Sequence, residues 1–303
     1  MKRFIYLLFL ALIHVPAFGR AQGVYALPFL AYEASPQLAG MGGALVGLPN
    51  NDLLAVDYNP AQIAHNRYLT SAYSKVKFLP AYGDVYLSEG GAGFGYDLAR
   101  PFPNLPLSIG AGFTQRFLYL GKNLWTDEYG NELGEFESKE WYTGYHLGIR
   151  FARVVNISVG YSAKRYFSRL TPVEIDAEAE NPDGWAHDVG ALVEWPLANF
   201  LPPVLYRSAD GQSALIPALT LSAGGALVNL GHAVRYIKKE QLDPLPRQAR
   251  LGIGVTGSLT LKSGDFSLRL LRFTYASQAE DYLAENHTDG TFSYQSFPGE
   301  INI

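Results

Sequence analysis

The chain has 303 residues, of which 48% are hydrophobic and 17% charged, and a formal net charge of −4. This charge argues against nucleic acid as a partner, because nucleic-acid-binding proteins need a basic surface to neutralise phosphates. The lack of cysteine excludes disulfide bonds, thiolate metal sites and a cysteine nucleophile. With 20 Tyr, 17 Phe and 31 Gly, the composition favours strands and tight turns over helices.

The first segment, residues 1–21, has the pattern of a cleaved secretory signal peptide. Two basic residues are followed by an apolar stretch over 4–15 and by small residues that end at Ala21, where we expect cleavage. A membrane-anchoring helix is the weaker alternative, since the apolar stretch is too short to span a bilayer and Pro16 interrupts it. An exported, cysteine-free and tyrosine-rich β chain is typical of the outer membrane of a Gram-negative bacterium.

Residues 22–67, called the leading segment below, show little of the alternation that marks a strand. A short helix is predicted around 60–64, with Asn59 as its N-cap and Pro60 at its first position. Three glycines near the middle of the segment are expected to let its backbone pass close to other backbone. These glycines are Gly40, Gly42 and Gly43.

From residue 68 onward, apolar and polar side chains alternate. In the stretch 155–168, Ile157 and Val159 share one parity and Ser158 has the other. Successive strand side chains point to opposite faces, so each such strand has one apolar and one polar face. Strands are predicted over 69–78, 84–88, 91–98, 105–120, 141–153, 155–168, 185–197, 216–230, 248–262 and 265–276.

These two-faced strands predict an all-β fold, an antiparallel transmembrane β-barrel over 68–303 with lipid outside and a polar interior. The alternative is a soluble sandwich, in which the apolar face is buried against a second sheet. Short joins alternate with long connections, as periplasmic turns and extracellular loops do. The long connections are 121–140, 170–184, 202–213 and 231–247. Three tryptophans are interpreted as an aromatic girdle at headgroup level: Trp141, Trp185 and Trp195.

The last predicted strands raise two further points. The apolar parity changes between Leu270 and Leu271, which predicts a β-bulge there. The strand count is odd for a single-chain bacterial barrel, even with a further strand over 291–303. Either strands are missed around 80–100 and 231–247, or the chain ends at Ile303 before its barrel closes.

The polar parity carries several charged or titratable side chains that we predict to face the interior. They are Arg116, His146, Arg150, Lys164, Arg250 and Arg269. They either set the electrostatics of a pore or pair with other groups to fill a wet interior, and pairing is the simpler explanation. The sequence has neither a G-x-S-x-G elbow nor an H-E-x-x-H motif, so we predict no enzyme and no cofactor.

An acidic run over 173–184 is the one candidate for a metal site. Its carboxylates could bind Ca²⁺, although their spacing is not that of an EF-hand and a solvated loop is the simpler explanation. The candidate ligands are Glu174, Asp176, Glu178, Glu180 and Asp183.

Three motifs carry a resemblance to a known family. The leading segment reads L-A-G-M-G-G-A-L-V-G-L at 38–48 and D-Y-N-P-A at 57–61, and D-P-L-P-R-Q-A-R-L-G-I-G-V follows at 243–255. These stretches resemble the FadL-like outer-membrane β-barrel proteins, and especially their PorV and PorQ branch, which is associated with the type IX secretion system.

The resemblance implies a barrel of fourteen strands whose leading segment folds inward as a plug. Asn59, Pro60 and Ala61 would lie in that plug, where they either cap a helix that seats it or contact a ligand. In PorV-like members the barrel receives secreted cargo proteins and hands them on for surface attachment, whereas in FadL-like members it admits hydrophobic molecules. We therefore expect a cargo-binding shuttle or scaffold subunit, with a channel for long-chain fatty acids or other hydrophobic compounds as the alternative.

Overall fold

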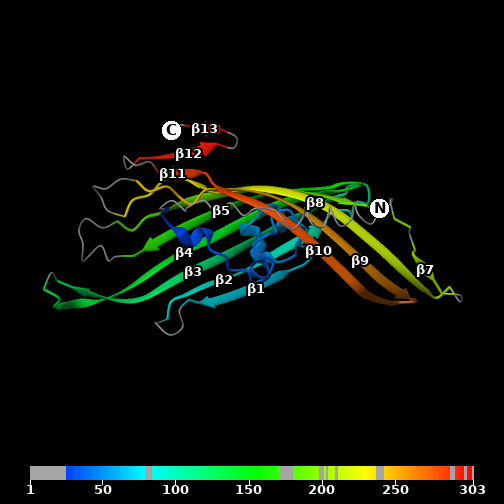
Figure 1. The fold of residues 1–303 in the computed structure, drawn as a ribbon, viewed down its shortest axis with the longest axis horizontal. Helices are drawn as coiled ribbons and strands as arrows, with labels where there is room; N and C mark the ends of the chain where they lie inside the picture. Colours follow the sequence, from blue (N-terminus) through cyan, green and yellow to red (C-terminus); the bar gives the residue numbers. More distant parts are fainter. Residues whose placement is uncertain are drawn as a thin grey trace, which may run out of the picture.

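The structure, a computed structural model, describes residues 25–78, 84–127, 129–170, 180–197, 201–202, 204–208, 211–236, 242–286, 291–296 and 299–301. The predicted signal peptide lies outside this part of the chain. The described residues form a curled antiparallel sheet, a small second sheet and several short helices (Figure 1). None of these helices has the length and apolar character needed to cross a membrane.

Ten strands form the large sheet. They are β1 (Thr70–Lys77), β2 (Tyr86–Asp97), β3 (Leu107–Thr126), β4 (Glu132–Ala152), β5 (Asn156–Arg169), β6 (Asp183–Pro196), β7 (Tyr206–Arg207), β8 (Ser213–Gly231), β9 (Gln248–Ser263) and β10 (Phe266–Tyr282). Each long strand pairs with its neighbour in the chain, and β7 pairs with β8. Within the described residues β1 and β10 do not pair with each other, so the sheet is a curled half-barrel (Figure 1). The structure thus confirms the prediction of an all-β fold with an antiparallel sheet.

The end of the chain differs from the prediction of one further strand over 291–303. A separate sheet contains β11 (Ala284–Asn286), β12 (Phe292–Ser296) and β13 (Gly299–Ile301). The β-bulge predicted between Leu270 and Leu271 is confirmed, because the register of β10 on β9 shifts between Arg269 and Leu271.

Two other predicted boundaries are wrong. The stretches 84–88 and 91–98 belong to one strand, β2, because Gly90 and Gly91 continue its pairing with β1. Residues 121–140 are not a loop, because β3 and β4 continue there as a long hairpin, and Trp141 lies inside β4. Apolar and charged side chains occur on both faces of that hairpin, so the alternation that marks a strand is missing although the backbone remains paired.

Apolar side chains cover the outer face of the sheet, the face away from the leading segment. Leu147 is 62% exposed and Ile157 is 48% exposed. This exposure argues against the alternative of a sandwich, in which a second sheet would bury these side chains. Other exposed apolar residues of this face are Phe94, Ile109, Phe113, Tyr145, Ile149, Phe151, Val159, Tyr161, Val189, Val193, Leu221, Leu251, Ile253 and Phe273.

The leading segment lies within the curve of the sheet, on its inner face (Figure 1). It contains η1 (Pro28–Ala31), α2 (Pro36–Gly40), η2 (Leu53–Asp57) and η3 (Pro60–His65). The helix predicted after Asn59 is confirmed as the 3₁₀ helix η3. The Asn59 side chain caps it by accepting a hydrogen bond of 3.0 Å from the Ala61 amide.

The role expected for Gly40, Gly42 and Gly43 is wrong. A Cβ atom at Gly40 or Gly42 would meet nothing within 4 Å, and one at Gly43 would meet only the Tyr58 hydroxyl at 3.7 Å. Gly42 and Gly43 have φ angles of 64° and 78°, so they serve the turn after α2. The close approach occurs at Gly47, where a Cβ atom would lie 2.3 Å from a carbonyl oxygen of β9.

Candidate functional site

A row of glycines on the inner face receives the leading segment. Directly paired positions on five neighbouring strands are all glycine: Gly95, Gly110, Gly148, Gly160 and Gly190. A Cβ atom at Gly160 would lie 2.2 Å from the carbonyl group of Pro60, and one at Gly110 would lie 2.0 Å from the carbonyl oxygen of Ile63. Any side chain in the row would therefore push η3 away from the sheet.

Asn59 connects three parts of the molecule at this row. Besides capping η3, its side-chain amide donates to the carbonyl of Val46 at 2.8 Å and to the carbonyl of Ala191 on β6 at 3.0 Å. The residue is fully buried, as are Pro60 and Ala61 of the same motif. These contacts favour the structural explanation of the Asn-Pro motif over direct ligand contact, since every polar atom of the Asn59 side chain is used within the protein.

A buried charge cluster lies beside the glycine row and joins the leading segment to the sheet. Its members are Asp57, Glu89, Arg116, Lys164 and Asp188, none more than 5% exposed. Asp57, the last residue of η2, accepts a hydrogen bond of 2.6 Å from Arg116 and another from the Tyr142 hydroxyl. Arg116 also donates to Glu89 at 2.6 Å. Lys164 Nζ lies 2.7 Å from an Asp188 oxygen and 3.8 Å from an Asp57 oxygen.

The charge state of Asp57 is set by its burial and by the neighbouring cations of the cluster. Burial alone would raise the pKa of Asp57, but the positive charges of Lys164 and Arg116 outweigh burial and hold the pKa well below its usual value. Asp57 is therefore ionised at neutral pH. A buried charge is costly unless it is paired, and Arg116 and Lys164 have the Asp57 carboxylate beside them only while the leading segment packs on the sheet.

His146 and Arg250 also lie on the inner face, as predicted, and both are paired within the protein. The ring nitrogens of His146 lie 2.9 Å and 2.7 Å from the hydroxyls of Thr114 and Ser162. Arg250 donates to Glu280 at 3.0 Å and to the backbone carbonyl of Asp57 at 3.2 Å. These contacts favour a filled polar interior over a charged pore for this part of the sheet.

Arg150 takes part in a second group that resembles a Ser-His-acid arrangement. His65 Nε2 lies 3.1 Å from the Ser158 hydroxyl, and His65 Nδ1 lies 3.7 Å from Glu194. Burial and the nearby positive charges of Arg150 and Arg67 lower the pKa of His65 to about 3, so His65 is neutral and Arg150 is the charged partner of Glu194, at 3.1 Å. Ser158 is 1% exposed beneath the leading segment, so its hydroxyl is out of reach of a substrate.

Two sets of predicted residues lie apart from these groups. Arg269 is exposed on β10, where it pairs in register with Thr260, away from the leading segment. Of the proposed calcium ligands, Glu174, Asp176 and Glu178 lie outside the described residues, and Asp183 forms an ion pair with Arg165. Glu180 is described, but across the described part of the chain no three His, Asp or Glu side chains gather in a way that could hold a metal ion.

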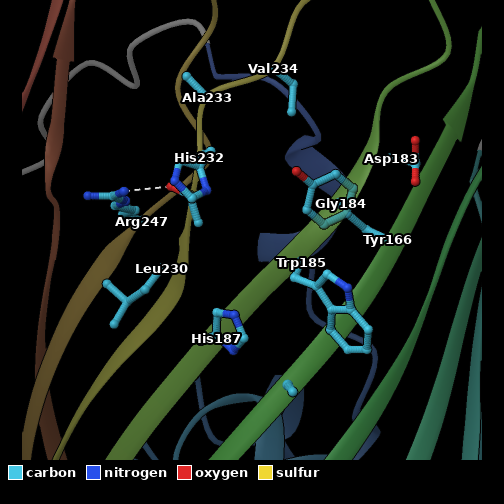
Figure 2. A pocket seen from close by; sticks show the side chains of 12 residues that line it. Tyr166, Asp183, Gly184, Trp185, His187, Leu230, His232, Ala233, Val234 and Arg247 are labelled. Atoms are coloured by element: carbon cyan, nitrogen blue, oxygen red, sulfur yellow. Dashed lines mark hydrogen bonds between the residues drawn. The ribbon is translucent and has the colours of Figure 1, made fainter.

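A cleft of about 930 Å³ opens where β6 and β8 separate, just beyond the pair Ala186 and Gly231. Figure 2 shows Tyr166 and Trp185 on one side of it and Leu230 and His232 on the other. Trp185 belongs to the outer face, whereas Tyr166 belongs to the apolar core between the sheet and the leading segment. The cleft is thus lined by residues of both faces and is mainly apolar.

The sequence reasoning missed the acidic half of the charge cluster. Glu89 and Asp188 lie on the same parity as the inner glycines of their strands, and this parity was an available signal. Asp57 gave no such signal, because its contacts with β3, β4 and β5 exist only after the leading segment has packed on the sheet.

In comparisons with known proteins, no protein-family model and no curated sequence matches the chain.

Proposed function

We propose that this protein is a non-enzymatic outer-membrane β-barrel protein of the PorV type, which serves type IX secretion as a cargo-binding shuttle or scaffold subunit. The observation that carries the proposal is the contrast between the two faces of the sheet. The outer face presents exposed apolar side chains, whereas the inner face is polar and filled by the leading segment. The resemblance of the leading segment to PorV-like proteins supplies the secretion role.

The outer face supports the membrane part of the proposal through its dimensions. On β4, outward residues from Trp141 to Phe151 include Tyr145, Leu147 and Ile149. Ten residue steps span about 33 Å along a strand at ~3.3 Å each, and a tilt of about 40° reduces this to roughly 25 Å, the height of the apolar band of outer-membrane barrels. The described strands would then belong to a barrel of fourteen strands, as in the family.

Aromatic and charged side chains at one border of this band fit a headgroup interface. Arg165 lies over the rings of Phe167 and Trp185, at 4.9 and 5.8 Å, and pairs with Asp183. Trp195 is exposed near the other end of β6. Tryptophan and arginine in such positions are typical of barrel interfaces with lipid headgroups.

The packing of the leading segment favours a shuttle or scaffold over a diffusion channel. The segment touches β2 to β6 along the glycine row and β9 at Gly47, and it is held by Asp57 and Asn59. A solute moving along this part of the inner face would have to break the buried charge cluster. Cargo would instead be handled at the ends of the strands, where the connections lie.

An arginine at Leu147 tests the membrane assignment. We expect Leu147→Arg to lower the free energy of unfolding in lipid vesicles by about 2–4 kcal/mol, because the charge enters the middle of the apolar band. Leu133→Arg is the matched control, since Leu133 is 51% exposed on the β3–β4 hairpin, beyond that band, and should change stability by less than about 0.5 kcal/mol. Equal stability of the two variants would contradict a membrane-facing outer surface.

Deletion of the gene tests the secretion role. We expect secreted cargo proteins to lose their surface display in the deletion strain and to regain it when the wild-type gene is restored. Protease accessibility of cargo on intact cells measures the display, and total outer-membrane protein provides the control for envelope damage. Normal display in the deletion strain would reject the PorV-type role.

The second candidate is a FadL-like channel for fatty acids or other hydrophobic compounds, and the cleft at β6 and β8 is the observation that favours it. Its apolar lining, with Trp185, Leu230 and Val234, is large enough for part of an acyl chain. The same deletion strain separates the two candidates. Loss of long-chain fatty acid uptake with intact cargo display would replace the first proposal with this one.

A further inference from the structure

The β3–β4 hairpin extends beyond the neighbouring strands at one end of the sheet (Figure 1). Pairing of β3 with β2 stops at Tyr119, and pairing of β4 with β5 stops at Lys139. Among the described residues, the strands beyond these two points pair only with each other, from Lys122 with Glu137 to Thr126 with Glu132. Neither outer edge of this ribbon, residues 120–126 and 132–137, has a strand partner in the described part of the chain.

The ribbon is acidic and partly apolar. Its exposed carboxylates share one face, since Glu137, Glu135 and Glu132 lie directly opposite Lys122, Leu124 and Thr126 across a register shift between Trp125 and Thr126. Leu124 and Leu133 are each about half exposed, and Tyr129 at the tip is 82% exposed. Exposed apolar side chains beside unpaired strand edges mark a surface for pairing with another chain.

The tip of the hairpin is ordered by its own hydrogen bonds. The Asp127 carboxylate accepts from the amides of Tyr129 and Asn131, at 2.9 and 2.8 Å, and from the Asn131 side chain at 2.8 Å. Binding to a preorganised strand costs less conformational entropy than binding to a loop that must first fold. The ribbon is therefore suited to accept a strand.

We infer that the β3–β4 ribbon docks an extended, lysine- and arginine-rich segment of a partner protein by strand addition. Backbone hydrogen bonds along a free edge supply affinity, and the glutamates select for basic side chains opposite them. A second copy that paired through the same 132–137 edge would place carboxylates opposite carboxylates, which is unfavourable in a strand pair. The inference rests on the proposed function in one respect: the membrane assignment decides on which side of the membrane the ribbon lies.

The test uses the full-length protein in detergent micelles and a fluorescent peptide of about ten residues with alternating Lys and Val. We expect saturable binding in fluorescence anisotropy. Affinity should fall about fivefold to tenfold in Glu132→Gln/Glu135→Gln, because two attractive charges are lost. The matched control is Asp84→Asn/Asp265→Asn, which removes the same charge at exposed positions off the ribbon and should leave affinity unchanged.

Two further arms distinguish strand addition from charge attraction alone. A peptide of equal charge with proline at alternate positions cannot form the backbone hydrogen bonds, so its binding should be at least tenfold weaker. A variant in which Leu120 and Ser138 are joined by Asn-Gly removes the ribbon and keeps the paired strands below it, and it should not bind the peptide. Equal binding of both peptides, or unchanged binding after removal of the ribbon, would overturn the inference, as would a wild-type protein that does not bind.

This experiment needs no secretion and no cargo, so it can fail independently of the proposed function. Peptide binding with normal cargo display in the deletion strain would keep the docking site and reject the secretion role. Loss of cargo display in the deletion strain, together with no peptide binding, would support the secretion role and reject the docking site.

Discussion

Replacing Asp57 by asparagine is expected to lower the free energy of unfolding by about 3 kcal/mol, the lower end of the range for breaking a buried ion pair. The lower end of the range applies because each cation retains one acidic partner after the change: Arg116 remains bonded to Glu89, and Lys164 remains paired with Asp188. Denaturant unfolding in detergent micelles measures the loss, and limited proteolysis should show cleavage within the leading segment. Asp84→Asn is the control, since that carboxylate is 83% exposed and its loss should cost less than about 1 kcal/mol.

The effect of Asp57 should depend on pH with a defined sign. Its pKa is lower in the folded protein than in the unfolded chain, where it is about 3.9. The stabilisation is therefore complete above that value and is lost as the pH falls below about 4. The difference in stability between wild type and Asp57→Asn should shrink on acidification. A second variant, Asp57→Asn/Lys164→Met, should be less stable than Asp57→Asn, because it also leaves the buried Asp188 carboxylate without the cation 2.7 Å away. A difference that grows towards low pH, or a double variant as stable as Asp57→Asn, would contradict the role given to the cluster.

A valine at Gly160 is expected to lower the free energy of unfolding by about 3 kcal/mol or more, since its Cβ atom would lie 2.2 Å from the Pro60 carbonyl and neither backbone can yield easily. Urea unfolding in micelles and protease cleavage of the leading segment are the measurements. Gly257→Val is the matched control on β9, because the nearest atom to its Cβ would be 3.9 Å away.

The two glycine variants separate packing from strand propensity. Valine favours strands over glycine at both positions, so propensity alone predicts a gain in both. If Gly160→Val were as stable as Gly257→Val, the leading segment would not depend on the glycine row. The same result would remove the structural support for a filled inner face.

Prediction from the sequence worked best where a strand faces two different environments. Alternation over 155–168 and 248–262 predicts β5 and β9 to within one residue at each end, because the pattern persists for as long as one face is apolar and the other polar. It failed at the β3–β4 hairpin, where apolar and charged side chains share one face, as Leu124 and Glu135 do. Asn59 and Pro60 were sufficient to predict the helix η3 from the sequence, because an N-cap acts on residues next to it in the chain.

The sequence by itself determined the all-β fold, the two-faced strands and the helix that starts at Pro60, because each follows from contacts between near neighbours in the chain. Only the tertiary structure decided that Asp57 meets Arg116 and Lys164, and that five glycines form one row beneath η3. The physical reason is the register between strands. It brings together residues tens of positions apart, and their charges and close contacts become visible only once the sheet has curled around the leading segment.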